Sequence, residues 1–382
     1  MAKHKYRYTT TAYMGETSRG VPNAVFWDPH AQIANGNPPV TFASGAPGSG
    51  KTNFAMTAGA ISALCGKTTI IIDWKGDFLN LKNLEKEIGP VRVWALGGGG
   101  SRGSLDPFYM SDDPQEKLRL AMDVIGMFLG GVENADVRQI SPIVNDVIQD
   151  KTKPASLSRV VAMLRGSENE HARGIGAQLH LVSQMNHAQI CFAPGGERPP
   201  TLNLEGGTTV ATLYGLELPA TQADALKDNS SRLASGIFYL LTDYIRRVMK
   251  ASNTPRPKTL IIDEAWAILA TEAGARITKE VSLLGRSKKL AMILATQNYD
   301  HIEGKGLDNT IGTRFAFRAE PAEAEQVVKG LGLNTTEGFD NLISDLDTGE
   351  CLMRDWEGNY STVQIEQWRP DWAKAFNTNP FL

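Results

Sequence analysis

The sequence has few cysteines and no long apolar run. Cys65, Cys191 and Cys351 lie far apart and form no Cys-x-x-Cys pair. This spacing argues against a disulfide framework or a zinc knuckle and favours a reducing compartment. No stretch approaches the roughly 20 apolar residues that a membrane-spanning helix needs, and residues 1–8 are basic but lack the apolar segment of a signal peptide. We therefore expect a cytoplasmic protein.

The sequence also has little excess charge. Its 39 Lys and Arg residues nearly balance 42 Asp and Glu residues, which gives a net charge of −3 at pH 7. This balance excludes a uniformly basic nucleic-acid binder but leaves room for a local basic channel. Apolar residues make up 42% and charged residues 21% of the 382 positions, an ordinary globular composition. The length predicts two or three domains, or one large α/β domain with an insertion.

Apolar runs alternate along the chain with helical patterns. Thr68–Asp73 is rich in β-branched residues and has no polar alternation, which is typical of a strand buried on both faces of a parallel sheet. Similar strands are predicted at 40–43, 91–96, 208–214, 259–263 and 290–296. We predict an α/β fold with a mostly parallel sheet. Its core comprises residues 1–110 and 196–382, and residues 111–195 form an inserted all-helical subdomain. Helical spacing predicts a helix at 140–149 within this insertion and another at about 273–284 in the core.

A glycine-rich loop follows the strand predicted at 40–43. It matches the pattern G-x-x-x-x-G-K-[ST] and consists of Gly45, Ala46, Pro47, Gly48, Ser49, Gly50, Lys51 and Thr52. Its glycines let successive N–H groups face an anion, and the following helix adds its positive end. We predict that Lys51 contacts the β- and γ-phosphates and that the Thr52 hydroxyl ligates magnesium. We include Asn53, the next residue, in the predicted nucleotide-binding site.

Two carboxylates follow the strand predicted at 259–263. In a phosphate-loop enzyme, Asp263 would hold the magnesium shell and Glu264 would orient and deprotonate the attacking water. The adjacent glutamate favours hydrolysis over phosphate transfer to a small molecule. The sequence contains no Asn-Lys-x-Asp segment, so guanine specificity has no support. We therefore predict ATP and Mg²⁺ as the ligands of a magnesium-dependent ATPase.

Polar side chains after other strands extend this site. Gln297 follows the strand at 290–296, where an amide can reach the γ-phosphate or its water. Lys75 follows Thr68–Asp73 at the sheet edge where ligands bind in such folds. Two interpretations stay open for Lys75, a contact to phosphate or DNA and a structural turn.

Three arginines are candidates for completing the site. Arg286 lies in the basic segment 285–289, which could contact phosphate in its own or a neighbouring subunit, touch DNA, or face solvent. Arg314 and Arg318 belong to a strand in which arginine and aromatic residues alternate. Either could reach a neighbour's nucleotide, and the alternative is a polar sheet face.

These segments together resemble a known family. Residues 263–266 read Asp-Glu-Ala-Trp and residues 295–297 read Ala-Thr-Gln. Both resemble motifs of the conjugative and type IV secretion ATPases, the TraC-like branch of the FtsK–HerA superfamily. Segments 73–77, 104–108, 285–289 and 349–354 are similar to further motifs of that branch, with Asp106 where the family has Asn.

The resemblance covers about residues 20–370 and implies a RecA-like P-loop NTPase core with an inserted helical region. It also implies a hexamer with trans-acting arginines, whose ATP hydrolysis powers substrate transfer or pilus assembly. Secretion-channel proteins would then be partners, and they would hold the chain at the inner face of the cell membrane. Family members carry a large N-terminal docking domain, whereas about 38 residues precede the first core strand here. We therefore expect a motor domain or a short branch.

Two other functions stay open. The first is a DNA-translocating, coupling-type ATPase of the same superfamily, with DNA as its partner. The second is a nucleotide-binding scaffold with poor turnover. Glu264 argues against the scaffold, because a scaffold needs no catalytic base.

Overall fold

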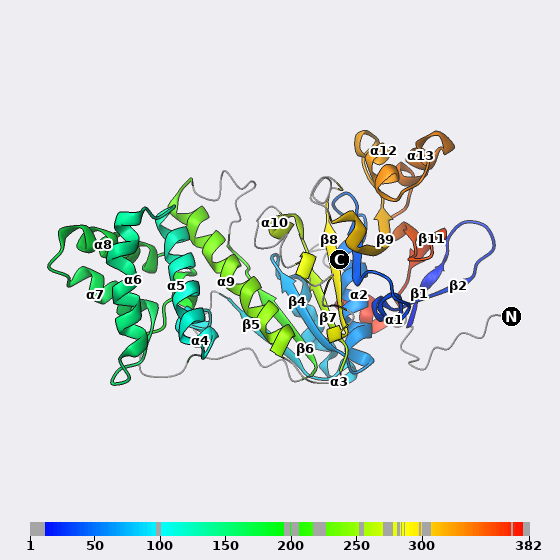
Figure 1. Cartoon of the computed structure of the whole chain (residues 1–382). Coiled ribbons are helices and arrows are strands. Elements are labelled where there is room, and N and C mark those ends of the chain that lie inside the picture. The colour runs from blue at the N-terminus through cyan, green and yellow to red at the C-terminus, as the bar shows by residue number, and fades with distance from the viewer. Residues whose placement is uncertain are drawn as a thin grey trace.

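The structure is a computed structural model in which a central sheet separates helices on its two faces (Figure 1). It describes residues 12–96, 101–194, 206–216, 227–251, 256–269, 278–280, 287–297, 307–367 and 370–376, and the single positions 199, 283, 285 and 299. The helix predicted at 273–284 lies mostly outside these residues. Among the described helices, none is long and apolar enough to cross a membrane.

Seven neighbouring strands run parallel to one another and form the core of the sheet. Along the sheet they are β9 (Ile311–Phe317), β3 (Val40–Ser44), β8 (Leu290–Thr296), β7 (Lys258–Ile262), β4 (Thr68–Asp73), β6 (Thr208–Thr212) and β5 (Val91–Ala95). Six of the seven are uniformly buried, and the edge strand β5 begins with the buried Val91 and then alternates between half-buried and exposed residues. The predicted α/β fold with a mostly parallel sheet is thus confirmed.

Four antiparallel strands extend the sheet beyond β9. They are β10 (Glu350–Arg354), β11 (Tyr360–Ile365), β1 (Ala12–Thr17) and β2 (Ala24–Trp27), in that order outward from β9. The first and last strands of the described chain therefore lie in one sheet, because β1 pairs with β11. This extension lies beyond β9, which pairs directly with the nucleotide-loop strand β3.

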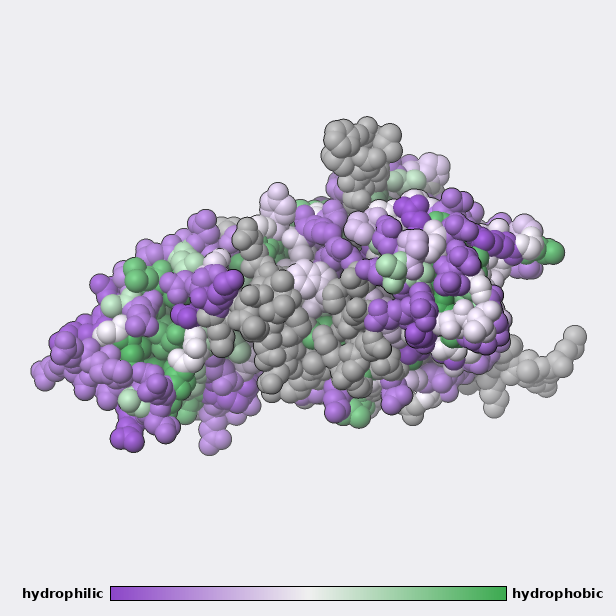
Figure 2. All heavy atoms as spheres, turned by 90° about the horizontal axis from the view of Figure 1, so that it is seen from above, coloured by the Kyte–Doolittle hydropathy of each residue, from purple (hydrophilic) through white to green (hydrophobic). Residues whose placement is uncertain are grey.

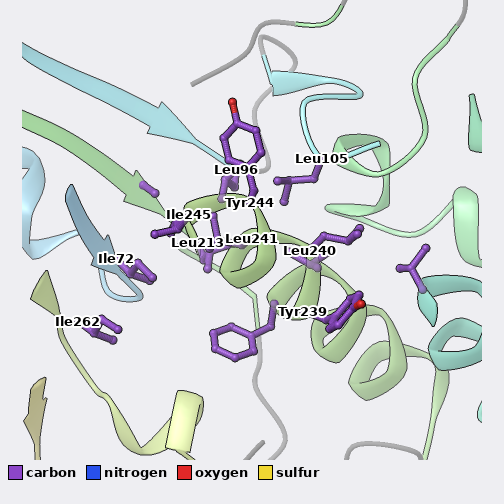
Figure 3. Close-up of a cluster of buried hydrophobic side chains, with 14 of the residues drawn as sticks. Ile72, Leu96, Leu105, Leu213, Tyr239, Leu240, Leu241, Tyr244, Ile245 and Ile262 are labelled. Carbon is purple, nitrogen blue, oxygen red and sulfur yellow. The ribbon is translucent and has the colours of Figure 1, made fainter. Parts of the chain in front are cut away.

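Each core strand sends alternate side chains to two separate hydrophobic clusters. Ile71 of β4 packs on one face with α2 (Lys51–Leu64), the 3₁₀ helix Asp77–Leu84 and α14 (Pro370–Ala375). Ile70 and Ile72 pack with α9 (Asn229–Ala251) on the other face. Figure 3 shows this second cluster, in which Leu241 and Ile245 gather with Ile72, Leu213 and Ile262. The sheet is thereby the middle layer of three.

A group of helices connects β5 to β6 and lies at one end of the molecule (Figure 1). It contains α4 (Pro107–Met110), α5 (Pro114–Leu129), α6 (Asn134–Gln149), α7 (Leu157–Arg165) and α8 (Glu170–Ser183). Seen from above, hydrophobic residues gather on it among hydrophilic ones (Figure 2). Helix α6 begins at Asn134, whereas the sequence pattern places its start at Ile140. Its first turns are mostly exposed and carry no apolar periodicity, so the pattern misses them.

Shorter helices complete the described fold. They are α1 (Pro29–Ala34), α3 (Glu85–Ile88), α10 (Trp266–Leu269), α12 (Pro321–Gly330) and α13 (Phe339–Ser344). Helices α12 and α13 follow β9 and stand apart from the layers in Figure 1. The domain limits at residues 110 and 195 stay predictions.

Asp106 connects three segments of the helical group through hydrogen bonds near the point where the group leaves the sheet. Its Oδ1 accepts a hydrogen bond from the N–H of Phe108 at 3.1 Å, and its Oδ2 accepts from the N–H groups of Leu157 and Ala193, both at 2.9 Å. The carboxylate is fully buried, and burial raises its pKa to about 7 despite these three donors. One side chain thus joins the first, middle and last parts of the helical group.

Replacing Asp106 with Ala should lower the free energy of unfolding by about 3 kcal/mol or more, because three buried N–H groups would lose their acceptor. Asp113→Ala is the matched control. Asp113 also caps a helix and precedes a proline, but it is exposed and accepts from the N–H of Gln115 alone. Its loss should cost about 1 kcal/mol. Urea denaturation measures both, and equal costs would contradict the role given to Asp106.

Candidate active site

The nucleotide loop connects the end of β3 to the start of α2. Two of its glycines are required by close contacts. A Cβ at Gly45 would lie 2.7 Å from Cβ of Phe317, and one at Gly50 would lie 2.9 Å from Cα of Gly349. Gly50 also has a φ of +112°, which disfavours other residues. The glycines thus let the loop turn tightly between β9 and the segment before β10.

Lys51 is folded back over this loop. Its Nζ donates to the carbonyl oxygens of Gly45 at 2.6 Å and Ala46 at 2.9 Å, and the side chain is buried. Burial lowers the pKa of Lys51 to about 8, although the carboxylates of Glu264 and Asp263 favour its charged form. The ammonium group is therefore poised at the loop, where a phosphate would be a stronger partner than two carbonyl groups.

Thr52 and Asp263 meet where α2 begins and β7 ends. The Thr52 hydroxyl donates to Oδ2 of Asp263 at 3.3 Å. Asp263 is almost fully buried, and burial, followed by the neighbouring charge of Glu264, raises its pKa to about 7. Parallel pairing of β7 with β8, which pairs in turn with β3, explains how residues 211 positions apart come together.

Glu264 accepts hydrogen bonds from three side chains on three segments. Gln297 Nε2 donates to its Oε1 at 3.1 Å and its Oε2 at 3.3 Å, Trp266 Nε1 donates to Oε2 at 3.0 Å, and Lys75 Nζ forms an ion pair with Oε1. Burial alone would raise the pKa of Glu264, but Lys75 and the two neutral donors hold it below its ordinary value. Glu264 is therefore an ionised carboxylate.

The backbone of Glu264 is itself unusual. Its φ is +50°, a left-handed conformation that a glutamate rarely adopts. Its N–H donates to Oδ1 of Asp263 at 3.1 Å, and the N–H of Ala265 donates to the carbonyl of Ala295 at 2.7 Å. These bonds hold the strained turn, which directs the Glu264 carboxylate toward Gln297 and Lys75.

Asp73 holds the loop that carries Lys75. Its Oδ1 accepts from the N–H groups of Lys75 at 3.2 Å and Gly76 at 2.9 Å, and its Oδ2 accepts from that of Phe78 at 3.0 Å. Asp73 is fully buried, and burial raises its pKa to about 6. The segment is thus a structural turn, as one interpretation of the sequence held, and it also delivers Lys75 to Glu264.

Segments far along the chain support the nucleotide loop from outside. The N–H of Ala46 donates to the carbonyl of Arg318 at 2.7 Å, and the N–H of Gly349 donates to the carbonyl of Ser49 at 2.9 Å. The predicted nucleotide residue Asn53 accepts at its Oδ1 from Nε2 of Gln367. Sequence reasoning missed Gly349 and Gln367 as loop contacts, because a contact between segments about 300 residues apart leaves no local pattern.

The three candidate arginines differ in position. Arg286 lies outside the described residues. Arg314 is buried within β9, where it pairs in register with Arg354 of β10, so a reach to a neighbouring subunit is disfavoured. Arg318 follows β9 next to the nucleotide loop and is half-buried. Arg318 is therefore the better candidate of the two that the structure describes.

The oxygen atoms of Thr52 and Asp263 fit a magnesium ion. A hydroxyl and a buried carboxylate are the hard oxygen ligands that Mg²⁺ takes, usually with phosphate oxygens and water. The neighbouring carboxylates of Asp263 and Glu264 repel each other, so a bound cation would stabilise their charged forms. Within the described residues no group of three or more His, Cys, Asp or Glu side chains could hold a metal.

Residues 32–376 match the family described as the AAA-like domain. The chain is also similar to the solved structure of VirB4 of Thermoanaerobacter pseudethanolicus, with 13% identity, a TM-score of 0.69, and coverage of 95% of this chain and 98% of that one. The bacterial conjugative coupling protein TrwBdeltaN70 in its unbound form gives 12% identity, a TM-score of 0.54, and coverage of 92% and 95%. The predicted fold, a P-loop ATPase core, is confirmed.

A curated relative is much longer than this chain. The uncharacterized protein YddE of Bacillus subtilis (strain 168) is 24% identical over 282 residues, which cover 72% of this chain and 33% of YddE. The chain spans about a third of the length of this relative.

Asp73→Ala should lower the free energy of unfolding by about 2–4 kcal/mol, because three N–H groups, that of Phe78 buried, lose their acceptor. Asp77→Ala, four residues along the same loop and only half-buried, is the control and should change stability by less than about 1 kcal/mol. Chemical denaturation followed by circular dichroism measures both. A cost for Asp73→Ala no larger than that for Asp77→Ala would show that the turn does not depend on this carboxylate.

Proposed function

The chain belongs to the AAA-like domain family, and from that premise we propose that it is the ATP-hydrolysing motor of a type IV secretion or conjugation system. The observation that carries hydrolysis is the convergence of Lys51, Thr52, Asp263, Glu264 and Gln297 at one edge of the sheet. Hydrolysis requires a water molecule to attack the γ-phosphate. A phosphate loop, a buried carboxylate and an ionised glutamate are the groups that this reaction needs.

Each residue has a defined part in the reaction. The N–H groups of the nucleotide loop and the ammonium of Lys51 bind the phosphates and stabilise the charge that develops on them. Glu264 orients the attacking water and accepts its proton. Gln297 donates from its side-chain Nε2 to Glu264 and thereby orients this carboxylate. The side-chain Oε1 of Gln297 accepts a hydrogen bond from the same water.

Thr52 and Asp263 are the residues that would hold Mg²⁺. When bound, the ion neutralises charge on the β- and γ-phosphates. Asp263 remains bound to the N–H of Glu264, so the magnesium ligand and the base keep a fixed separation.

Structural similarity favours the secretion motor over the coupling protein. VirB4 matches with a TM-score of 0.69 and TrwBdeltaN70 with 0.54, and each match covers over 90% of both chains. The near-neutral net charge of −3 also gives no bulk support for tracking along DNA. The second candidate is the DNA-translocating ATPase, because a local basic channel is compatible with this composition.

The proposed motor has partners beyond nucleotide. We expect it to assemble with further copies of itself as a hexamer and to act on secretion-channel proteins. These partners would place it on the cytoplasmic side, at the inner face of the cell membrane. DNA is a partner only in the coupling-type alternative.

Glu264→Gln should bind ATP and hydrolyse it at least about a hundredfold more slowly, because an amide cannot accept the proton of the attacking water. Glu325→Gln on the exposed face of α12 is the control and should keep full turnover. Lys51→Ala should lose nucleotide binding or turnover and serves as the blank. Phosphate release measures all three, and normal turnover of Glu264→Gln would rule out its role as the base.

Phosphate release should be unchanged by single- or double-stranded DNA if the chain is a secretion motor, because its activators are then proteins. The assay uses ATP with Mg²⁺, and Lys51→Ala sets the background. Strong stimulation by either form of DNA would instead select the coupling-type translocase.

Turnover per chain should rise with protein concentration if an arginine of a neighbouring subunit completes the site. Arg318→Ala should then lower turnover at high concentration while leaving dilute activity nearly unchanged. Activity that stays strictly proportional to concentration over a wide range would exclude a trans-acting arginine.

A further inference from the structure

Lys75 pairs with Glu264 at the edge of the active site. Its ammonium pairs with Oε1 of Glu264, yet 53% of the Lys75 side chain is exposed, against 10% for Glu264. Its backbone is fixed through Asp73, which binds the N–H groups of Lys75 and Gly76. Lys75 thus has a rigid base and a long side chain with an open path to solvent.

The pair with Lys75 limits what Glu264 can do. A carboxylate offers about four lone-pair directions. Lys75 and Gln297 occupy those of Oε1, and Trp266 and Gln297 occupy those of Oε2. A water molecule that is to give its proton to Glu264 must displace one of these donors. Lys75 is the one of the three that carries a charge, so an anion can draw it away.

A phosphate bound at the nucleotide loop would be that anion. Thr52, at the end of the loop, donates to Asp263. Asp263 in turn accepts from the N–H of Glu264, the partner of Lys75. The charge of Lys75 contributes to the lowered pKa of Lys51, after the larger effect of burial and alongside the opposing carboxylates. Two ammonium groups therefore lie at the same edge of the sheet, where the nucleotide loop would bind a phosphate. A terminal phosphate with about two negative charges is a stronger partner for an ammonium than one shared carboxylate.

We propose that Lys75 is a second phosphate-binding lysine, which leaves Glu264 for the γ-phosphate when a nucleoside triphosphate binds. The inference rests on the proposed nucleotide site. Departure of Lys75 frees Oε1 of Glu264 to accept a hydrogen bond from the attacking water. A nucleoside diphosphate has no γ-phosphate, so it leaves the pair in place. The same side chain thus distinguishes triphosphate from diphosphate and releases the base.

Carbodiimide cross-linking tests the exchange without requiring turnover. A zero-length reagent joins the paired amine and carboxylate as an amide, and mass spectrometry of the digest measures the Lys75–Glu264 product. The wild-type chain is compared without nucleotide, with ADP and Mg²⁺, and with the non-hydrolysable analogue AMP-PNP and Mg²⁺. The exposed pair of Lys329 and Glu325, 2.7 Å apart on α12, is the internal control.

We expect the Lys75–Glu264 product without nucleotide and with ADP, and its loss with AMP-PNP, while the Lys329–Glu325 product stays constant. An equal yield with ADP and AMP-PNP would overturn the inference. Since AMP-PNP is not hydrolysed, this result does not depend on the catalytic role given to Glu264.

Binding affinities give an independent test with Lys75→Met, which keeps the side-chain length and removes the charge. Calorimetry should show AMP-PNP binding weakened about tenfold, the loss of one charge-assisted contact, and ADP binding changed by less than about twofold. Equal changes for both nucleotides would overturn the role given to Lys75 and leave the proposed nucleotide site standing. If the wild-type chain binds neither nucleotide, the proposed function itself fails, and the inference fails with it.

Discussion

Parallel pairing of β3, β8, β7 and β4 is the constraint on which the active site depends. Parallel strands end at the same edge, so the residues that follow them meet there. The nucleotide loop follows β3, Gln297 follows β8, Asp263 and Glu264 follow β7, and Lys75 follows β4. Hydrogen bonds join these segments directly, and a shift in the register of any one strand would move its functional side chain away from the others.

Burial gives this edge its electrostatic character. The same removal from water lowers the pKa of Lys51 and raises that of Asp263, so each group is less strongly charged than in solution. Glu264 differs because a lysine and two neutral donors stabilise its charged form. The site therefore keeps Glu264 ionised for proton transfer. A bound phosphate would favour the charged form of Lys51, and a bound metal ion would favour the charged form of Asp263.

Support for the nucleotide loop comes from segments that lie far from it in the sequence. The segment before β10 donates to Ser49, and the end of β9 accepts from Ala46. Because β1 pairs with β11, the first and last strands of the described chain both belong to the sheet extension whose segment before β10 contacts this loop.

Sequence alone determined the α/β class, the nucleotide loop and the carboxylates at 263 and 264. These features are local, because glycine conformations, a strand without polar alternation and a following acidic pair are written in consecutive residues. The first turns of α6 were missed for the same reason, since they carry no apolar repeat. Tertiary structure alone decided that Lys75 pairs with Glu264, that Arg314 is buried and that Gly349 supports Ser49. Such contacts join residues up to 300 positions apart, and only the order of the strands in the sheet brings them together.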